Sequence, residues 1–172
     1  MGWRRIKQKK KKSPKFIMRI DPEVDEAVDQ ALVIAERGNI RQAEKIISEL
    51  LRDNSDIHTV QFALGVVCGM KGQYGESIAY FDKAIAIFPY FVEAWFNKGA
   101  SHQKNLEVEE MIRAFQKVVE LGDPTEDFVR QAKTMLRDFE LKLGEDKGLT
   151  LEGYLKGCNK FNEAFAAMVK FA

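Results

Sequence analysis

The chain has 172 residues, of which 45% are hydrophobic and 31% charged, a composition typical of one globular domain with room for a hydrophobic core. No run of about 18 apolar residues occurs, and no apolar segment follows the basic N-terminus, so we expect neither a membrane span nor a signal peptide. Cys68 and Cys158 lack metal-binding or redox spacing. Together these features predict a cytoplasmic protein in a reducing compartment.

Residues 1–20 form a basic arm on an otherwise acidic chain. They contain nine Lys and Arg residues and no acid, whereas the other 152 residues contain 18 basic and 26 acidic side chains. Such an arm, which we expect to be flexible, can bind nucleic acid or an anionic membrane surface by releasing counterions. It can equally be a tail that only keeps the protein in solution. The residues available for contacts are Arg4, Arg5, Lys9, Lys10, Lys11 and Lys12.

A period of 34 residues runs from residue 24 to about residue 120. Two sets of equivalent positions define it, one of small residues and one of large apolar residues. The sets are Ala31, Gly65 and Gly99, and Ile47, Phe81 and Phe115. A small residue on one helix lets a second helix approach closely, and the large residue fills the space beside it. The period predicts three repeats, at about 24–57, 58–91 and 92–124, each a pair of helices.

The middle repeat shows this pattern most clearly. Apolar residues recur at helical spacing on both sides of a turn, and Pro89 ends the second helix because it lacks a backbone N–H. Its residues Leu64-Gly65, Gly72-Gln73-Tyr74, Ser77, Phe81, Ala84 and Pro89 resemble those of the tetratricopeptide repeat family. The third repeat carries a similar set, and the first repeat is weaker. The resemblance implies an all-α fold, a right-handed α-solenoid of antiparallel helix pairs whose first helices line a concave groove.

A further helix is predicted over residues 125–143, which would extend the solenoid to residues 21–143. Asp123 can cap this helix, Pro124 suits its first position, and Glu126 completes a capping box. Residues 144–148 predict a turn, and two short helices are expected within the C-terminal segment 144–172. This segment either folds back as a cap that fills a groove or begins a truncated repeat, and the sequence leaves both readings open.

The resemblance also places a set of apolar residues along the groove. They are Val28, Leu32, Phe62, Val66, Met70, Phe96 and Ala100 on the concave face, with Tyr90 at its edge. Such a groove suits an amphipathic helix or an extended apolar peptide of a partner protein. The C-terminal segment or a second copy of the chain could fill it instead. Some tetratricopeptide co-chaperones bind a C-terminal carboxylate through Lys, Asn and Arg side chains. Only Asn97 matches that set, so no carboxylate clamp is expected.

No catalytic residue, cofactor or metal site is predicted. His58 and His102 are interpreted as packed or half-exposed residues, and Cys68 as a small buried one. No glycine-rich phosphate loop or metal-ligand spacing occurs. We therefore expect a non-catalytic scaffold for protein–protein interaction. The alternative is a protein that docks on nucleic acid or an anionic surface through its basic arm.

Overall fold

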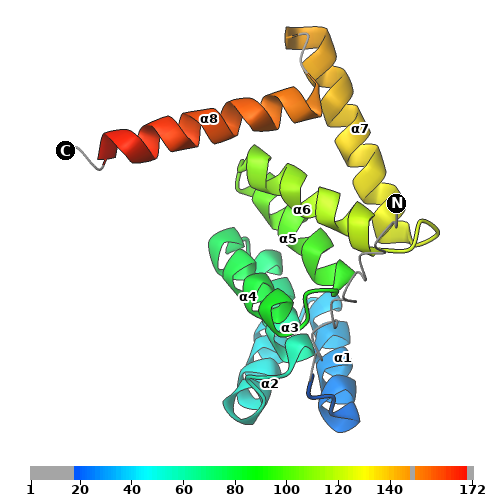
Figure 1. The fold of residues 1–172 in the computed structure, drawn as a ribbon. Coiled ribbons are helices and arrows are strands. Elements are labelled where there is room, and N and C mark those ends of the chain that lie inside the picture. The colour runs from blue at the N-terminus through cyan, green and yellow to red at the C-terminus, as the bar shows by residue number, and fades with distance from the viewer. Residues whose placement is uncertain (1–17, 148–149, 170–172) are drawn as a thin grey trace, which may run out of the picture.

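The computed structural model describes residues 18–147 and 150–169. Within these residues the chain forms eight α-helices and no β-strand (Figure 1). They are α1 (Pro22–Glu36), α2 (Ile40–Asp53), α3 (His58–Met70), α4 (Tyr74–Ile87), α5 (Val92–Lys104), α6 (Val108–Leu121), α7 (Asp127–Lys147) and α8 (Leu151–Val169). In the described part of the chain, no helix combines the length and apolar character needed to cross a membrane.

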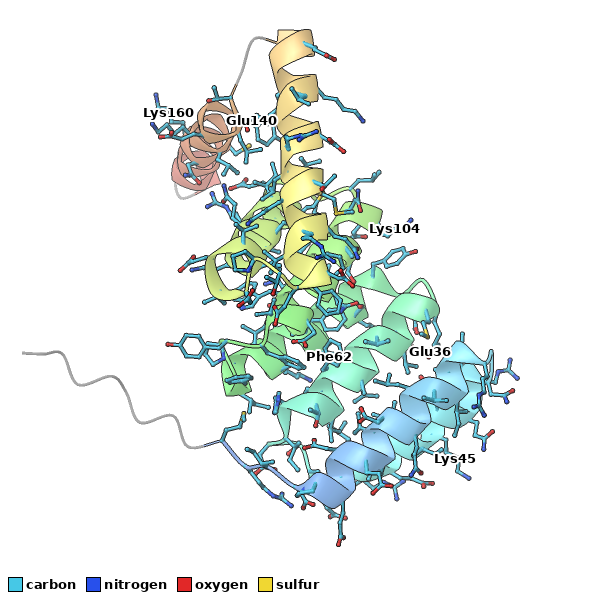
Figure 2. All side chains as sticks on the ribbon, turned by 90° about the vertical axis from the view of Figure 1, so that its right-hand side faces the viewer. Glu36, Lys45, Phe62, Lys104, Glu140 and Lys160 are labelled. Carbon is cyan, nitrogen blue, oxygen red and sulfur yellow. The ribbon has the colours of Figure 1, made fainter. Side chains whose placement is uncertain are left out.

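The first six helices form three antiparallel pairs that stack along the chain. α1 packs on α2, α3 on α4 and α5 on α6, while contacts from α2 to α3 and from α4 to α5 join successive pairs. The first helices of the pairs form a layer of their own, because α1 contacts α3, α3 contacts α5 and α5 contacts α7. Figure 2 shows the stack from α1 at one end to α7 at the other. The predicted α-solenoid of helix pairs is confirmed.

Glycines on α3 and α5 allow the two helices of a pair to approach closely. A Cβ atom at Gly65 would lie 2.6 Å from Cε1 of Phe81, and a Cβ atom at Gly99 would lie 2.7 Å from Cε1 of Phe115. Real Cβ atoms do not approach other atoms so closely, so each phenylalanine ring occupies the space that a side chain would need. The structure therefore shows the small-against-large packing that the 34-residue period predicts.

The turn inside each pair contains one residue in the left-handed region of backbone space. This residue is Gly38 in the first pair, with φ 94°, and Gly72 in the second, with φ 76°. The third pair has Leu106 there, with φ 62°. A residue with a Cβ atom is strained by about 1 kcal/mol in this conformation. Leu106 is also 85% exposed, so little burial of its side chain offsets the strain.

Helix α7 begins later than the sequence suggests. Oδ1 of Asp123 accepts hydrogen bonds from the backbone N and from Oγ1 of Thr125, at 2.8 and 2.6 Å. These two bonds favour the charged carboxylate and lower the pKa of Asp123. Because the oxygen caps the turn over residues 123–126, it cannot cap the helix, which starts at Asp127. The predicted helix start at Asp123 and Pro124 is therefore wrong.

The C-terminal region also differs from its prediction. α7 continues through the expected turn as far as Lys147, and α8 is one helix where two were predicted. Neither stretch contains a proline, and a single glycine inside a helix costs only about 1 kcal/mol. Packing against a neighbouring helix can compensate for a cost of that size, so the glycines at 144, 153 and 157 do not interrupt the helices.

Helix α8 lies against α7 and α6, outside the concave groove. Leu151, Tyr154 and Leu155 pack against the core that α6 and α7 share, with the ring of Tyr154 5.8 Å from that of Phe139. Nη2 of Arg113 on α6 donates a hydrogen bond to Oδ1 of Asn159 on α8, at 2.6 Å. Beyond these contacts α8 leads away from the stack (Figure 1).

Candidate functional site

An inner pocket lies between α3 and α5 on the concave side of the stack. Its volume is about 340 Å³. α3 contributes Val66 and Met70, α5 contributes Ala100, and the buried ring of Phe81 from α4 forms part of its wall. The other lining residues are Gly65, Gly69, Tyr74, Ser77, Asn97, Ser101, Gln103 and Lys104. The pocket therefore gathers Val66, Met70 and Ala100 of the predicted groove residues and adds polar groups from α5.

Phe62 and Phe96 have a structural role in addition to their place on the first helices. Phe62 is half-buried, and its ring centre lies 5.7 Å from that of Phe81. Phe96 is also half-buried and lies 5.6 Å from Phe115 and 5.2 Å from Phe128. Neither residue lines the inner pocket. Truncating them would weaken the fold as well as any binding surface, so they are poor positions at which to test binding alone.

Packing covers the apolar residues that were predicted to line the groove on α1. Val28 is only 2% exposed and belongs to the core formed by α1, α2 and α3. Leu32 is partly buried and packs against the same core. Val28 is therefore wrong as a groove residue, because the contact between α1 and α3 covers it. At the opposite edge, Tyr90 lies in the loop between α4 and α5 and is 60% exposed.

One stripe of α5 supplies the polar side of the pocket. Glu93, Asn97, Ala100 and Lys104 follow one another at four, three and four residues, which places them on one helix face. Nδ2 of Asn97 donates a hydrogen bond to the backbone O of Glu93 at 2.8 Å, so this amide is used within its own helix. The sequence reasoning missed Lys104. The signal for it was available, since Lys104 stands 34 residues after Met70.

Comparison with known proteins agrees with this geometry. A sequence model described as Tetratricopeptide repeat matches residues 58–91. A protein of Arabidopsis thaliana, the Tetratricopeptide repeat domain-containing protein PYG7, chloroplastic, is 28% identical to the chain over 122 residues. The sequence is thus similar to the tetratricopeptide repeat family, most directly over residues 58–91. The aligned part covers 69% of this chain and 40% of PYG7, so the chain spans less than half the length of that relative.

Solved structures of tetratricopeptide repeat domains share the fold. The Sgt2 TPR domain from Aspergillus fumigatus matches with a TM-score of 0.63 at 15% identity, covering 75% of this chain and 85% of that one. The first TPR of Spaghetti (RPAP3), bound to the HSP90 peptide SRMEEVD, matches with a TM-score of 0.62 at 14% identity. That alignment covers 73% of this chain and 97% of the other. At such identities the likeness concerns the fold alone.

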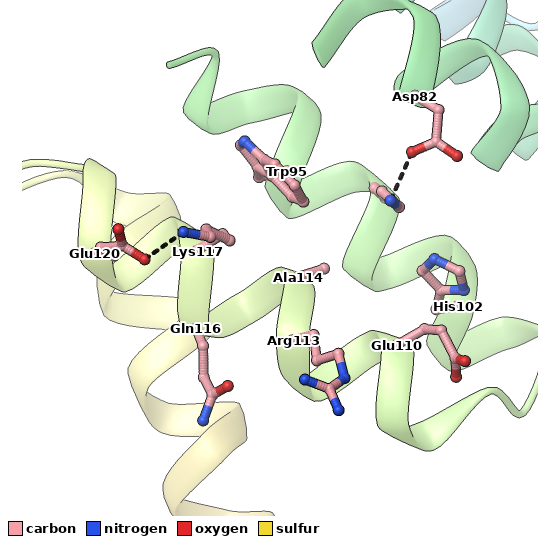
Figure 3. Close-up of a pocket in the computed structure, with 10 residues that line it drawn as sticks. Asp82, Trp95, His102, Glu110, Arg113, Ala114, Gln116, Lys117 and Glu120 are labelled. Atoms are coloured by element: carbon pink, nitrogen blue, oxygen red, sulfur yellow. Dashed lines mark hydrogen bonds and ion pairs between the residues drawn. The ribbon is translucent and has the colours of Figure 1, made fainter. Parts of the chain in front are cut away.

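A second pocket lies on the outer face, between α4, α5 and α6. Its volume is about 590 Å³, and Figure 3 shows its lining residues. Two lysines on its wall are paired: Lys98 with Asp82 and Lys117 with Glu120, each at 2.6 Å. Arg113 pairs with Glu109, also at 2.6 Å. Because these cations already have carboxylate partners, the outer pocket is not an open anion site.

His102 lies at the wall of the outer pocket and is only 6% exposed. Its Nδ1 lies 2.6 Å from Oε2 of Glu107, and its buried Nε2 has no hydrogen-bond partner among the described residues. Cys68, at the equivalent place in the middle repeat, is 5% exposed. Burial raises the pKa of the Cys68 thiol, and the nearby Glu76 carboxylate raises it further. Both side chains thus occupy packed positions, as the repeat predicts.

His58 sits at the start of α3 among aromatic rings. Its ring centre lies 4.9 Å from that of Phe91 and 5.3 Å from that of Phe88. Burial lowers the pKa of His58, while the carboxylates of Asp25 and Glu93 oppose this shift. The neutral form is therefore favoured, which suits a half-buried residue with an aromatic contact on two sides.

Some predictions cannot be compared with the structure. The basic-arm residues Arg4, Arg5 and Lys9 to Lys12 lie outside the described residues. Within the described residues, no group of three or more His, Cys, Asp or Glu side chains could hold a metal ion.

Proposed function

We propose that the protein is a non-catalytic scaffold that binds an apolar peptide or an amphipathic helix of a partner protein in its concave groove. The inner pocket between α3 and α5 is the observation that carries this proposal. Its volume of about 340 Å³ falls in the range of ligand sites. Met70 at its wall is 42% exposed, so the pocket presents a large apolar side chain that a ligand can contact.

A structure with the same fold supports a peptide as the ligand. The first TPR of Spaghetti (RPAP3) is bound to an HSP90 peptide in its solved structure. In the present chain the contact would be led by apolar side chains, because Val66 and Ala100 line the pocket and Asn97 is hydrogen-bonded within its own helix. The proposal is therefore peptide binding without a carboxylate clamp.

A charged substitution at the pocket tests the proposal. Peptides selected on the wild-type protein from a displayed library of apolar and amphipathic sequences would be measured by fluorescence anisotropy. Met70→Asp should weaken their binding at least about tenfold, because a carboxylate buried against an apolar ligand loses hydration without gaining a partner.

Leu141→Asp is the matched control, since Leu141 is another large apolar residue, 56% exposed, on α7 away from the inner pocket. It should leave the affinity unchanged. Circular dichroism would verify that both variants are folded. Equal binding of the selected peptides to wild type and to a folded Met70→Asp variant would contradict the proposal.

The basic arm supports a second candidate, binding to nucleic acid or an anionic surface. Nine cations within residues 1–20 carry it. Deleting residues 1–15 should abolish retention on nucleic acid or anionic vesicles while peptide binding persists, and retention that does not fall with rising salt would exclude this mode. Self-association through the groove or the C-terminal helix stays a prediction, which sedimentation of the wild type can test. A cytoplasmic location also stays a prediction.

A further inference from the structure

Equivalent positions on successive first helices lie side by side on the concave face. The stripe of Glu93, Asn97, Ala100 and Lys104 on α5 stands 34 residues after Thr59, Ala63, Val66 and Met70 on α3. Oγ1 of Thr59 donates a hydrogen bond to Oδ1 of Asp25 on α1 at 2.6 Å, and these residues are also 34 apart. The period therefore aligns one stripe of each first helix across the groove.

The same stripe is acidic on α1. It consists of Asp25, Asp29, Leu32 and Glu36. Asp29 and Glu36 are exposed, and neither makes a hydrogen bond or ion pair with another described residue. Only Asp25 is engaged, by the hydroxyl of Thr59. The α1 side of the groove therefore presents two carboxylates that are open to a ligand.

The stripe is mainly basic on α7. Ala132 is fully buried and stands 33 residues after Gly99, so the stripe of α7 begins at Glu126, just before the helix, and continues with Arg130, Lys133 and Arg137. Arg130 is used locally, because it pairs with Asp127. Lys133 and Arg137 are exposed and make no hydrogen bond or ion pair within the described part of the chain.

The charge on the concave face thus changes from negative to positive across the stack. This face is acidic on α1, uncharged on α3, mixed on α5 with one acid and one base, and mainly basic on α7. We propose that this gradient selects and orients the bound segment. The partner is an apolar segment with Lys or Arg at the end that lies over α1 and Asp or Glu at the end that lies over α7. This inference rests on the proposed function and specifies its ligand.

The dimensions of the fold set the length of that segment. Packed helices lie about 8 to 10 Å apart, so the three steps from α1 to α7 span about 27 Å. An extended chain rises about 3.3 Å per residue and covers this distance with about eight or nine residues. Its centre then lies over α3 and α5, where the inner pocket would take its apolar side chains.

Peptides with one apolar centre and different ends test the gradient. The centre is that of a peptide selected on wild type, flanked by two Lys at one end and two Glu at the other, or by Gln at both ends. In about 50 mM salt the charged peptide should bind the full-length protein about tenfold more tightly than the Gln peptide. This advantage should shrink in about 300 mM salt, because exposed pairs are screened.

Charge reversal on either wall should remove this advantage. Asp29→Lys with Glu36→Lys on α1, or Lys133→Glu with Arg137→Glu on α7, would each make one end of the charged peptide face like charges. All four substitutions together should restore the tenfold advantage with the peptide reversed. A nitroxide label at the lysine end would report this, since it should broaden the amide signals of α1 in wild type and those of α7 in the fourfold variant.

Lys45→Glu with Glu49→Lys on the exposed side of α2 is the matched control and should change nothing. Equal binding of the Gln and charged peptides at low salt, with no preferred label position, would overturn the gradient while leaving the groove as the binding site. Peptide binding that ignores Met70→Asp would overturn the proposed function itself. Tight binding only after removal of residues 1–17 would also overturn the partner assignment, because it would place the chain's own basic arm over α1.

Discussion

The middle and third repeats share the close contact between their two helices and differ at other equivalent positions. In both, a glycine on the first helix faces a buried phenylalanine of the second, at nearly the same close approach. Four other equivalent positions hold unrelated residues. The pairs are Gln61 and Trp95, Leu64 and Lys98, Cys68 and His102, and Gly72 and Leu106. The close contact is therefore the same in these two repeats, whereas their residues at a pocket wall or a turn differ.

Three of these differences, at Trp95, Lys98 and His102, contribute to the outer pocket. Gln61 and Leu64 in the middle repeat are buried, at 5% and 4% exposure. Their counterparts Trp95 and Lys98 are only half-buried and line the outer pocket. Shared positions thus hold the stack together, and the positions that differ shape the surface of each repeat.

The largest effect is expected where the two repeats agree. Gly65→Ala and Gly99→Ala should each lower the free energy of unfolding by about 2 kcal/mol, because the new Cβ atom forces the facing ring to move in a packed core. Urea denaturation measures the change. Gly75→Ala on α4 is the control, since a Cβ atom there meets nothing within 4 Å. It should leave stability unchanged or raise it by up to about 1 kcal/mol.

The first repeat suggests a second substitution that would compensate for the stability lost in Gly65→Ala. It holds Ala31 and Ile47 at the same two places, and both are fully buried. Gly65→Ala combined with Phe81→Ile should therefore cost less than the sum of the two single changes. Strictly additive costs would show that these positions do not form one packing unit.

A smaller effect, with opposite signs in the two repeats, is expected at the turn. Leu106→Gly should raise the free energy of unfolding by about 1 kcal/mol, because glycine adopts a positive φ without strain. Gly72→Leu should lower it by a similar amount, about 1 kcal/mol. Thermal unfolding of both variants measures these two changes in stability. A destabilised Leu106→Gly variant would mean that the leucine side chain makes a stabilising contact after all.

The smallest effect concerns pH and the start of the middle repeat. His58 stands where the first and third repeats have Val24 and Val92. Burial holds the pKa of His58 below its ordinary value of 6.5, so the unfolded chain binds the proton more readily. The contribution of His58 to stability is complete above pH 6.5 and declines as pH falls toward the lowered value. His58→Val should flatten the loss of stability between about pH 7 and pH 5 in urea unfolding. An unchanged pH dependence of the free energy of unfolding would show that His58 does not cause this loss.

The sequence predicts the structure well where the same packing recurs at equivalent positions of successive repeats. The helix pairs and the glycine–phenylalanine packing follow from the 34-residue period. Three residues that line the inner pocket were expected on the concave face from the resemblance to the tetratricopeptide repeat family. Prediction from the sequence failed where the use of one carboxylate, or a contact between distant segments, decides the structure. The start of α7 depends on a turn that uses the carboxylate of Asp123, and α8 is placed by contacts with Phe139 and Arg113.

The amino-acid sequence determined the stacking of helix pairs, because steric demands between a small and a large residue are short-range and recur every 34 positions. Only the tertiary structure decided which sides of those helices stay open. Val28 and Phe62 stand at equivalent positions, yet Val28 is covered by its neighbours and Phe62 is only half-buried. The exposure of a side chain depends on which neighbouring helices pack against it, and the spacing of residues along the sequence does not contain that information.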